Sequence, residues 1–160
     1  MKLKTFQKKL LEKKIDLAFL VHPDTNITYF TQMKPSFAYL TITPKSASFY
    51  VTKLDSPPKL KNIRVKFLRK GWEDKIKSSK IKTIGINKNL LSVAFLEKIK
   101  KIFPKAKFVD ISYLLKGLRI QKTVEETKLL TKACKITSNA FNQVIKKLAE
   151  KKLHTEQEVA

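Results

Sequence analysis

Residues 117–136 read GLRIQKTVEETKLLTKACKI, and this stretch separates two different sequence patterns. Thr123 and Glu126 have the spacing of a capping box, in which the hydroxyl accepts from the third helical amide and the carboxylate accepts from the capping amide. Apolar residues then recur at helical spacing to about residue 150. The stretch therefore predicts a long C-terminal helix, and it places the boundary before that helix near residues 117–122.

Upstream of this boundary, short helical and strand patterns alternate. Strand-like runs cover residues 17–21, 36–43, 46–52, 63–68, 83–86 and 108–109. Helical patterns cover residues 3–14, a short segment through Tyr29 and Phe30, and residues 72–78, 90–103 and 111–118. In the first of these helices we expect Leu3, Phe6, Leu10 and Leu11 on one buried face. The order of elements predicts an α/β domain with a mixed sheet flanked by helices.

The charge of the chain is strongly positive. Its 160 residues carry a formal net charge of +22, and 32 of the 35 basic residues are lysine. Specific base readout favours the planar guanidinium group of arginine, and the lysines are spread along the whole chain. We therefore expect no specific nucleic-acid recognition, although nonspecific binding to polyanions at low salt remains an expectation.

The remaining composition predicts a cytoplasmic protein with no membrane span. The longest apolar runs, such as residues 17–21, are too short to cross a bilayer, and the first residues lack the apolar stretch of a signal peptide. The single cysteine, Cys134, excludes an internal disulfide framework. Because it falls within the long helix, we expect it to be a small buried residue rather than a reactive thiol.

The residues by themselves predict no active site. His22 and His154 are far apart and lack metal-ligand spacing; we expect His22 in a turn and His154 on the surface. The aspartates stand mostly at the ends of predicted elements, as capping residues do, and Glu125 and Glu126 suit a helix N-terminus. The residue patterns therefore predict a globular α/β domain without evident catalytic chemistry.

Four segments resemble one known family. Residues 117–136 resemble the pattern Leu-Arg-x-x-Lys-Ser-x-x-Glu, which joins the two domains of Xaa-Pro peptidases and creatinases, and residues 155–160 resemble the Thr-Glu-x-Glu-Val-Ala that follows it. Residues 26–32 resemble Asn-Ile-x-Tyr-Leu-Thr-Gly, and residues 83–86 resemble a short Ile-Gly-Ile strand of the same family. Two positions depart from the family pattern, because Gln32 and Leu153 stand where glycine is usual.

The resemblance implies an N-terminal, non-catalytic domain over residues 1–118 and a linker with the first helix of a catalytic domain over residues 119–160. In the family, the missing part of that catalytic domain holds two divalent metal ions, such as Mn or Co, with two Asp, one His and two Glu. None of those positions is present here, so we expect no catalytic residue and no metal in this chain. The chain would then be a cloned domain, the product of a truncated gene, or one half of a split enzyme.

The resemblance also implies partners: the catalytic domain, a second copy in a homodimer, and proline-containing peptides as substrates. N-terminal domains of this family lend loop residues to the rim of an active site, so the candidates by position are Phe30, Gln32, Met33, Lys34 and Phe37. A plain surface loop is the alternative. The stripe of the long helix supplies the interface candidates Leu130, Phe141, Val144, Ile145 and Leu148.

A second interpretation is a stand-alone module of the same fold that binds acidic proteins or polyanions. The DNA downstream of the codon for Ala160 distinguishes the two interpretations. A reading frame that continues into the five metal ligands supports the peptidase, whereas a stop codon supports a stand-alone module or a split enzyme.

Overall fold

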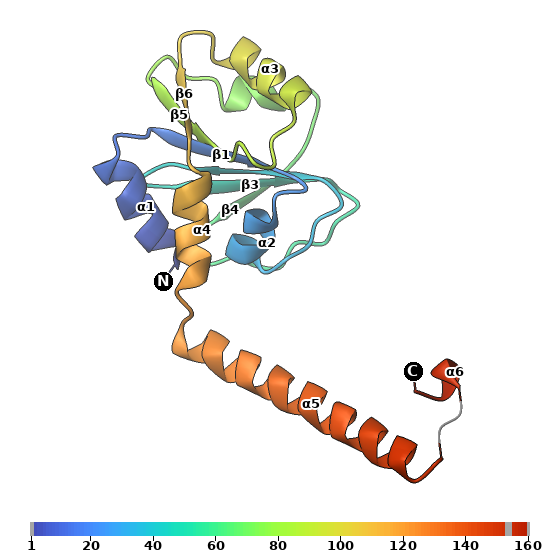
Figure 1. Ribbon diagram of the computed structural model, residues 1–160. Helices are drawn as coiled ribbons and strands as arrows, with labels where there is room; N and C mark the ends of the chain where they lie inside the picture. Colours follow the sequence, from blue (N-terminus) through green and yellow to red (C-terminus); the bar gives the residue numbers. More distant parts are fainter. Residues whose placement is uncertain (1, 153–154, 160) are drawn as a thin grey trace. The chain divides into compact units, whose positions relative to one another are not determined.

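The structure is a computed structural model that describes residues 2–152 and 155–159. The chain forms two compact units, of which the first extends to Arg119 and the second begins at Ile120 (Figure 1). None of the helices in the described ranges combines the length and the apolar content that a membrane span requires.

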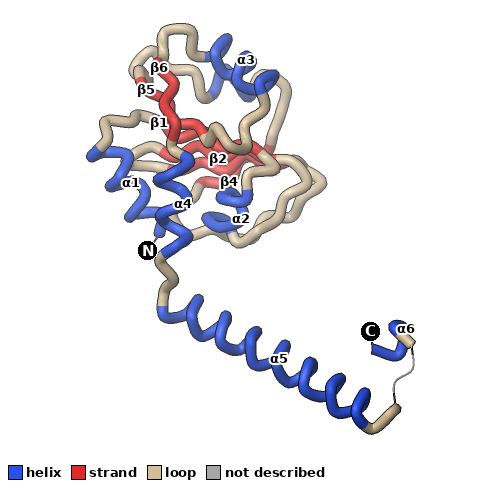
Figure 2. The backbone as a smooth tube through the Cα atoms, in the orientation of Figure 1, coloured by secondary structure: helices blue, strands red, loops and turns tan. Residues whose placement is uncertain are grey.

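The first unit contains the predicted elements in the predicted order. Its helices and strands are α1 (Lys2–Glu12), β1 (Leu17–Val21), α2 (Thr25–Thr31), β2 (Ala38–Ile42), β3 (Ala47–Val51), β4 (Arg64–Phe67), the 3-10 helix η1 (Trp72–Lys75), β5 (Thr83–Ile86), α3 (Val93–Ile102), β6 (Lys107–Asp110) and α4 (Ser112–Ile120). The second unit contains α5 (Val124–Ala149) and the short α6 (Glu156–Val159). Figure 2 shows α5 as one continuous helix.

The six strands form one mixed sheet in the order β4-β3-β2-β1-β5-β6, which confirms the predicted fold class. β1 pairs with β2, and β2 with β3, in antiparallel fashion. β1 with β5, β5 with β6, and β3 with β4 are parallel pairs. The strand-like runs expected over residues 36–43 and 46–52 therefore form the β2–β3 hairpin. Because β1 lies inside the sheet and both its faces are covered, all five of its residues are buried.

Helices cover both faces of the sheet and enclose two hydrophobic cores. Helices α1, α2 and α4 lie on one face, and α3 lies on the other (Figure 1). The α1-side core contains side chains from all three helices of its face and from the inner strands, including Phe6, Leu10, Ile27, Leu40, Phe49, Leu115 and Leu118. The α3-side core contains Phe19, Tyr39, Tyr50, Trp72, Ile84, Ile86, Ile99 and Ile102. Alternate residues of β1 face the two cores, as Phe19 and Leu20 illustrate.

Several local expectations need correction. Leu11 is 66% exposed, because α1 buries only the side of the helix that carries Phe6 and Leu10. The helix expected over residues 90–103 begins only at Val93, because the hydroxyl of Ser92 caps it by accepting from the Phe95 amide at 3.3 Å. The helix expected to end at residue 118 is nine residues long and extends to residue 120.

Candidate functional site

The loop that carries the predicted rim residues begins where α2 ends. Asp24 caps the start of this helix, because its Oδ1 atom accepts from the backbone amide of Asn26 at 2.8 Å. At the other end the Gln32 amide donates to the carbonyl oxygen of Thr28 at 2.7 Å, and Gln32 has left-handed backbone angles of φ 53° and ψ 23°. The chain therefore leaves the helix through a tight turn at Gln32.

The five predicted rim residues lie in two different environments. Phe30 and Met33 are half-buried and pack against the α1-side core. Gln32 and Lys34 are exposed, and Phe37 is 39% exposed. Gln32, Lys34 and Phe37 are thus available to a ligand at the surface, whereas Phe30 and Met33 mainly fix the loop to the domain.

A carboxylate holds the far end of the loop to the connection between β3 and β4. Asp55 accepts hydrogen bonds from the amide of Ser36 at 3.0 Å and from its hydroxyl at 2.8 Å. The hydroxyl of Thr52 donates to the same carboxylate at 2.7 Å. The Ser36 amide first, and the Thr52 hydroxyl next, lower the pKa of Asp55 below its ordinary value, so the carboxylate is ionised at neutral pH.

Phe37 opens onto an aromatic depression of about 390 Å³. Its ring meets the Tyr39 ring edge-on at a centroid distance of 5.1 Å, and Tyr39 stacks on Trp72 at 4.3 Å. The rest of the lining consists of Leu68, Arg69, Lys70 and Gly71, which lie between β4 and η1, and of Glu73, which lies in η1. The depression therefore offers aromatic surface to an apolar ring or side chain, with charged groups at its border.

The electrostatics of this depression favour a neutral phenol beside a paired carboxylate. Burial, and then the negative charge of Glu73, raise the pKa of Tyr39 to about 12. Glu73 in turn lies 3.0 Å from the ammonium group of Lys98, which also lies 5.4 Å from the centroid of the Trp72 ring. Tyr39 therefore remains protonated at physiological pH and is not placed to act as a base.

Sequence reasoning missed Tyr39 and Trp72 as members of this site. Tyr39 belongs to a strand, and a strand aromatic ordinarily predicts core packing. The available signal in the sequence was Gly71, because a glycine directly before the only tryptophan can adopt a positive φ. In the structure Gly71 has a φ of 76° and precedes η1, which places Trp72 in the lining of the depression.

The carboxyl ends of the parallel strands, where open α/β sheets commonly bind ligands, are closed by polar side chains. Asp24, after β1, accepts from the side-chain amide of Asn87, after β5, at 2.8 Å. The hydroxyl of Ser112, after β6, donates to the Oδ1 atom of Asn87 at 2.9 Å. The space beside Asp24 and Asn87 is too narrow to admit even a water-sized ligand. These residues therefore connect strands, and Asp24 is one of the aspartates that cap a helix, as their positions at the ends of predicted elements indicated.

Two motifs that are far apart in the sequence meet where α4 ends. The hydroxyl of Tyr29, in α2, donates to the carbonyl oxygen of Leu118 at 2.9 Å. The guanidinium of Arg119 donates to the hydroxyl of Thr25, at the start of α2, at 3.1 Å. The helix that leads into the candidate loop is thus bonded directly to the last turn of the first unit.

The interface candidates all lie on α5, which begins with the predicted capping box. The Thr123 amide donates to Glu126 Oε2 at 2.9 Å, and the Glu126 amide donates to the Thr123 hydroxyl at 3.2 Å. No residue of α5 is buried: Val144 is half-buried, and the exposed members of the stripe are Leu130, Phe141, Ile145 and Leu148. Cys134 is also exposed, so the expectation of a buried cysteine is wrong, because α5 buries neither side of itself. His154 and Leu153 lie outside the described residues.

Comparison with known families decides what this domain is. The family model described as the creatinase/prolidase N-terminal domain matches residues 2–121, which is most of the chain. The chain belongs to this family. The family resemblance is thereby confirmed, and the match includes residues 26–32 and 83–86.

Relatives of this creatinase/prolidase N-terminal domain are longer proteins. The chain is 31% identical over 146 residues to the Xaa-Pro dipeptidase of Pyrococcus horikoshii and 30% identical over 152 residues to that of Pyrococcus furiosus. These matches cover 89% and 93% of this chain but only 41% and 42% of the relatives. The crystal structure of the prolidase from Pyrococcus horikoshii OT3 superposes with a TM-score of 0.80 at 26% identity, covering 99% of this chain and 46% of that one.

A solved structure of an isolated domain shows the same fold. The creatinase/prolidase N-terminal domain of an X-Pro dipeptidase from Streptococcus pyogenes matches 72% of this chain and 97% of its own length, with a TM-score of 0.57 at 21% identity.

Gln32 occupies the position where the family usually has glycine, and its left-handed φ of 53° supplies the turn that a glycine would make there. The departure at Gln32 therefore leaves the turn itself intact.

Proposed function

We propose that this chain is the non-catalytic N-terminal part of an Xaa-Pro dipeptidase or aminopeptidase, in which it supports dimerisation and shapes the access of proline-containing peptides to a metal-dependent catalytic domain. The observation that carries the proposal is the family match over residues 2–121, together with relatives that are Xaa-Pro dipeptidases more than twice as long as the matched region. The division between the two domains of the enzyme falls between residues 118 and 119. We place the enzyme in the cytoplasm as part of the same proposal.

The catalytic chemistry belongs to the remainder of the enzyme. Among the described residues, no three His, Cys, Asp or Glu side chains are grouped so as to hold a metal ion. Hydrolysis by a pair of divalent metals requires such clustered ligands, so the two metal ions, such as Mn or Co, would bind to the catalytic domain.

Substrate access is assigned to the surface formed by the candidate loop and the aromatic depression. Phe37 belongs to both, and Gln32 and Lys34 lie on the exposed side of the loop. Loops that a rigid scaffold positions commonly supply specificity contacts. Here the scaffold contacts are the Asp55–Ser36 hydrogen bonds at one end and the half-buried Phe30 and Met33 at the other.

The stripe on α5 is assigned to an interface with the remainder of the catalytic domain. Phe141 is 63% and Ile145 is 50% exposed, together with Leu130, Leu148 and the half-buried Val144 on the same helix. A continuous apolar stripe of this kind marks a surface that another part of the enzyme covers. The charged residues between these positions suit a helix that remains partly in water.

The test begins with the gene and continues with the enzyme. We expect the reading frame to continue beyond Ala160 into two Asp, one His and two Glu, and we expect the complete protein to cleave Xaa-Pro dipeptides when supplied with Mn²⁺ or Co²⁺.

In that enzyme, Phe37→Ala should raise KM or lower kcat several-fold, because it removes an aromatic contact from the rim. Tyr113→Ala is the matched control, because Tyr113 is an aromatic residue that is 85% exposed on α4 and outside the depression.

Two results would contradict the proposal at different levels. A stop codon directly after Ala160, with no separate gene for a catalytic half, would contradict the assignment to a peptidase. Equal kinetics for wild type, Phe37→Ala and Tyr113→Ala would be consistent with a peptidase but would contradict the role of the loop in substrate access.

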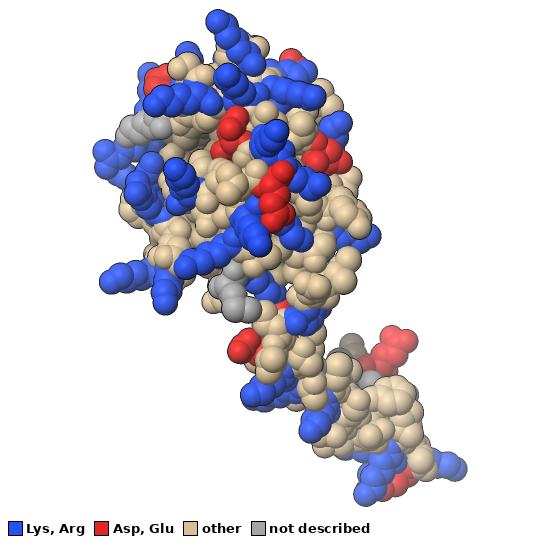
Figure 3. All heavy atoms as spheres, turned by 90° about the vertical axis from the view of Figure 1, so that its left-hand side faces the viewer, with Lys and Arg blue, Asp and Glu red and all other residues tan. Residues whose placement is uncertain are grey.

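The second candidate function, a stand-alone module that binds proteins or polyanions, is favoured by one observation. The net charge is +22, and lysine and arginine side chains are spread over the face of the first unit that Figure 3 presents and outnumber the acidic side chains there. Binding of this kind weakens steeply with salt, because it releases counterions from the polyanion. Affinity for heparin that persists at physiological salt would favour the module over the peptidase.

A further inference from the structure

At the opposite end of β2, β3 and β4 from the aromatic depression, the surface is hollowed a second time. This depression has a volume of about 420 Å³ and lies where the β2–β3 hairpin meets the start of β4. Its apolar lining consists of Ala47, Leu60 and Ile63, and its polar lining consists of Lys45, Ser46, Asn62 and Arg64. Every charged group in the lining is therefore positive.

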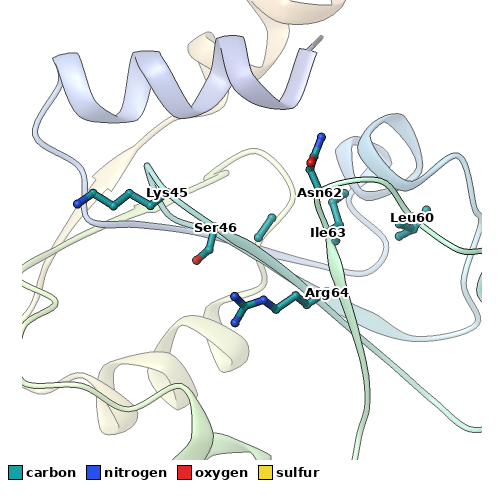
Figure 4. Close-up of a pocket in the computed structure, with 7 residues that line it drawn as sticks. Lys45, Ser46, Leu60, Asn62, Ile63 and Arg64 are labelled. Carbon is teal, nitrogen blue, oxygen red and sulfur yellow. The ribbon is translucent and has the colours of Figure 1, made fainter.

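Both cations of this depression are available to a ligand. Lys45 and Arg64 are exposed, and neither forms an ion pair with a carboxylate anywhere in the ranges that the structure describes. Figure 4 shows the guanidinium group of Arg64 extending from β4 toward Ser46, whereas Lys45 and Asn62 extend away from these two along the rim. Arg64 and Ser46 thus extend to the same side of the polar lining.

The hydroxyl of Ser46 can donate into the depression. Its Oγ atom lies 3.0 Å from the Oγ1 atom of Thr43, and either of these oxygens can be the donor. When Thr43 donates to Ser46, the Ser46 proton is free to turn toward the depression. The hairpin also fixes the Ser46 backbone, because the carbonyl oxygen of Ser46 accepts from the Thr43 amide at 2.8 Å.

We propose that this depression, called here the hairpin site, binds a tetrahedral oxyanion, namely a phosphate ion or the phosphoryl group of a small phosphorylated molecule. The planar guanidinium of Arg64 presents two parallel N–H groups to two oxygens of such a group. Ser46 donates to a third oxygen, and the flexible ammonium group of Lys45 adds a second positive charge. The proposal is independent of the peptidase function, since it uses no residue of the candidate loop.

The test is a titration of the full 160-residue chain with inorganic phosphate at constant ionic strength, followed by backbone amide NMR. We expect saturable shifts confined to the amides of residues 43, 45–47 and 62–64. Glycerol phosphate in a second arm distinguishes the two kinds of ligand. If the site is built for free phosphate, glycerol phosphate should bind more weakly than phosphate. If the site is built for a phosphoryl ester, glycerol phosphate should bind at least as tightly as phosphate. Acetate in a third arm measures the response to a planar monoanion.

Matched variants separate a local site from the general positive charge. Arg64→Gln should weaken phosphate binding about tenfold or more, because it removes the charged bidentate donor. Lys105→Gln removes the same charge from an exposed position outside the depression and should leave the affinity unchanged. Arg64→Lys keeps the charge but loses the planar fork, so its affinity should fall between those of wild type and Arg64→Gln.

Arg64 is exposed, so these variants should fold, and unchanged amide shifts in the α1-side core will verify this. Equal losses in Arg64→Gln and Lys105→Gln, or phosphate-induced shifts spread over lysines throughout the chain, would show that only the net charge attracts the anion and would overturn the proposal. A full response to acetate with the same affinity would also overturn it, because the site would not distinguish a tetrahedral oxyanion.

Discussion

Replacing Gly85 by alanine should destabilise the first unit, although alanine ordinarily stabilises a chain relative to glycine. Gly85 lies in the middle of β5, between β1 and β6. A Cβ atom at this position would lie 2.6 Å from Ile111 Cγ2, 3.2 Å from Ile111 Cδ1 and 3.3 Å from Ile15 Cγ2. Favourable carbon–carbon contacts lie at about 3.5–4.0 Å, so Ile111 would have to move by about 1 Å.

Ile111 has little freedom to make that movement. Its side chain is completely buried, and its amide donates to the Ile86 carbonyl oxygen at 3.0 Å. Forcing a methyl group into such a core costs about 1–3 kcal/mol, while the smaller entropy of the unfolded alanine chain returns about 0.5–1 kcal/mol. We therefore expect Gly85→Ala to lower the free energy of unfolding by about 1–2 kcal/mol, which is about 4–8 °C in Tm for a domain of this size.

Denaturant unfolding followed by tryptophan fluorescence measures this change, because Trp72 is the only tryptophan and belongs to the first unit. Ile111→Ala removes both of the Ile111 atoms that the new Cβ would meet and leaves only the 3.3 Å contact with Ile15 Cγ2, so Gly85→Ala should cost much less in that background. Gly117→Ala is the control, because nothing lies within 4 Å of its Cβ position in α4, and it should stabilise by about 0.5–1 kcal/mol. An equal cost for Gly85→Ala in both backgrounds would refute the steric reasoning.

Three further predictions concern the loop and α5. The wild-type chain should self-associate as salt rises, because screening weakens the repulsion from its +22 charge. The double variant Phe141→Asp with Ile145→Asp should abolish the association, since both side chains are exposed on α5. A wild type that sediments as a monomer at high salt and high concentration would contradict this prediction. Gln32→Gly should change the free energy of unfolding by less than about 1 kcal/mol, because glycine adopts the φ of 53° at this position freely. Gln32→Val should lower the free energy of unfolding by about 1–2 kcal/mol, because a β-branched side chain is strained at that φ. Equal Tm values for the two variants would refute the role of the turn. The lowered pKa of Asp55 stabilises the loop above its unfolded-state pKa, near 3.8, and that contribution is lost as the pH falls through the lower folded-state value. The protection of the Ser36 amide, which compares its exchange rate with that of an unstructured chain at the same pH, should therefore fall there in wild type and stay at that lower value at all pH values in Asp55→Asn. Wild-type protection that does not change with pH would argue against this bond.

The sequence predicted the fold better than the surface. Runs such as residues 17–21 indicate their structure locally, since a wholly apolar pentamer between polar residues suits a strand buried on both faces. The capping box at Thr123 is likewise a local signal, and the structure confirms it. The exposure of Leu11 and Cys134 depends on what else covers a helix, and helical spacing alone carries no such information.

The candidate site was less predictable, because its members come from separate segments. The loop was found only through the resemblance of residues 26–32, and its assignment to substrate access stays a prediction. The contact of Tyr39 with Trp72 joins a strand to a 3-10 helix, and no spacing rule relates two such positions. The same holds for Arg64 and Ser46 of the hairpin site, which the parallel pairing of β3 with β4 brings to one depression.

The strand order determines which parts of the sheet can form while the chain is still being synthesised. β1 is an early strand, and its neighbour β2 follows after 16 residues, so the antiparallel half of the sheet can form soon after it emerges. Its other neighbour, β5, begins only at Thr83, and the α1-side core is not complete until Leu115 and Leu118 of α4 have been added. During that interval one edge of β1 has no partner, which is the state in which nascent chains are most open to wrong strand pairing. The bond from Tyr29 to Leu118, which spans 89 residues, is among the last native contacts that synthesis permits.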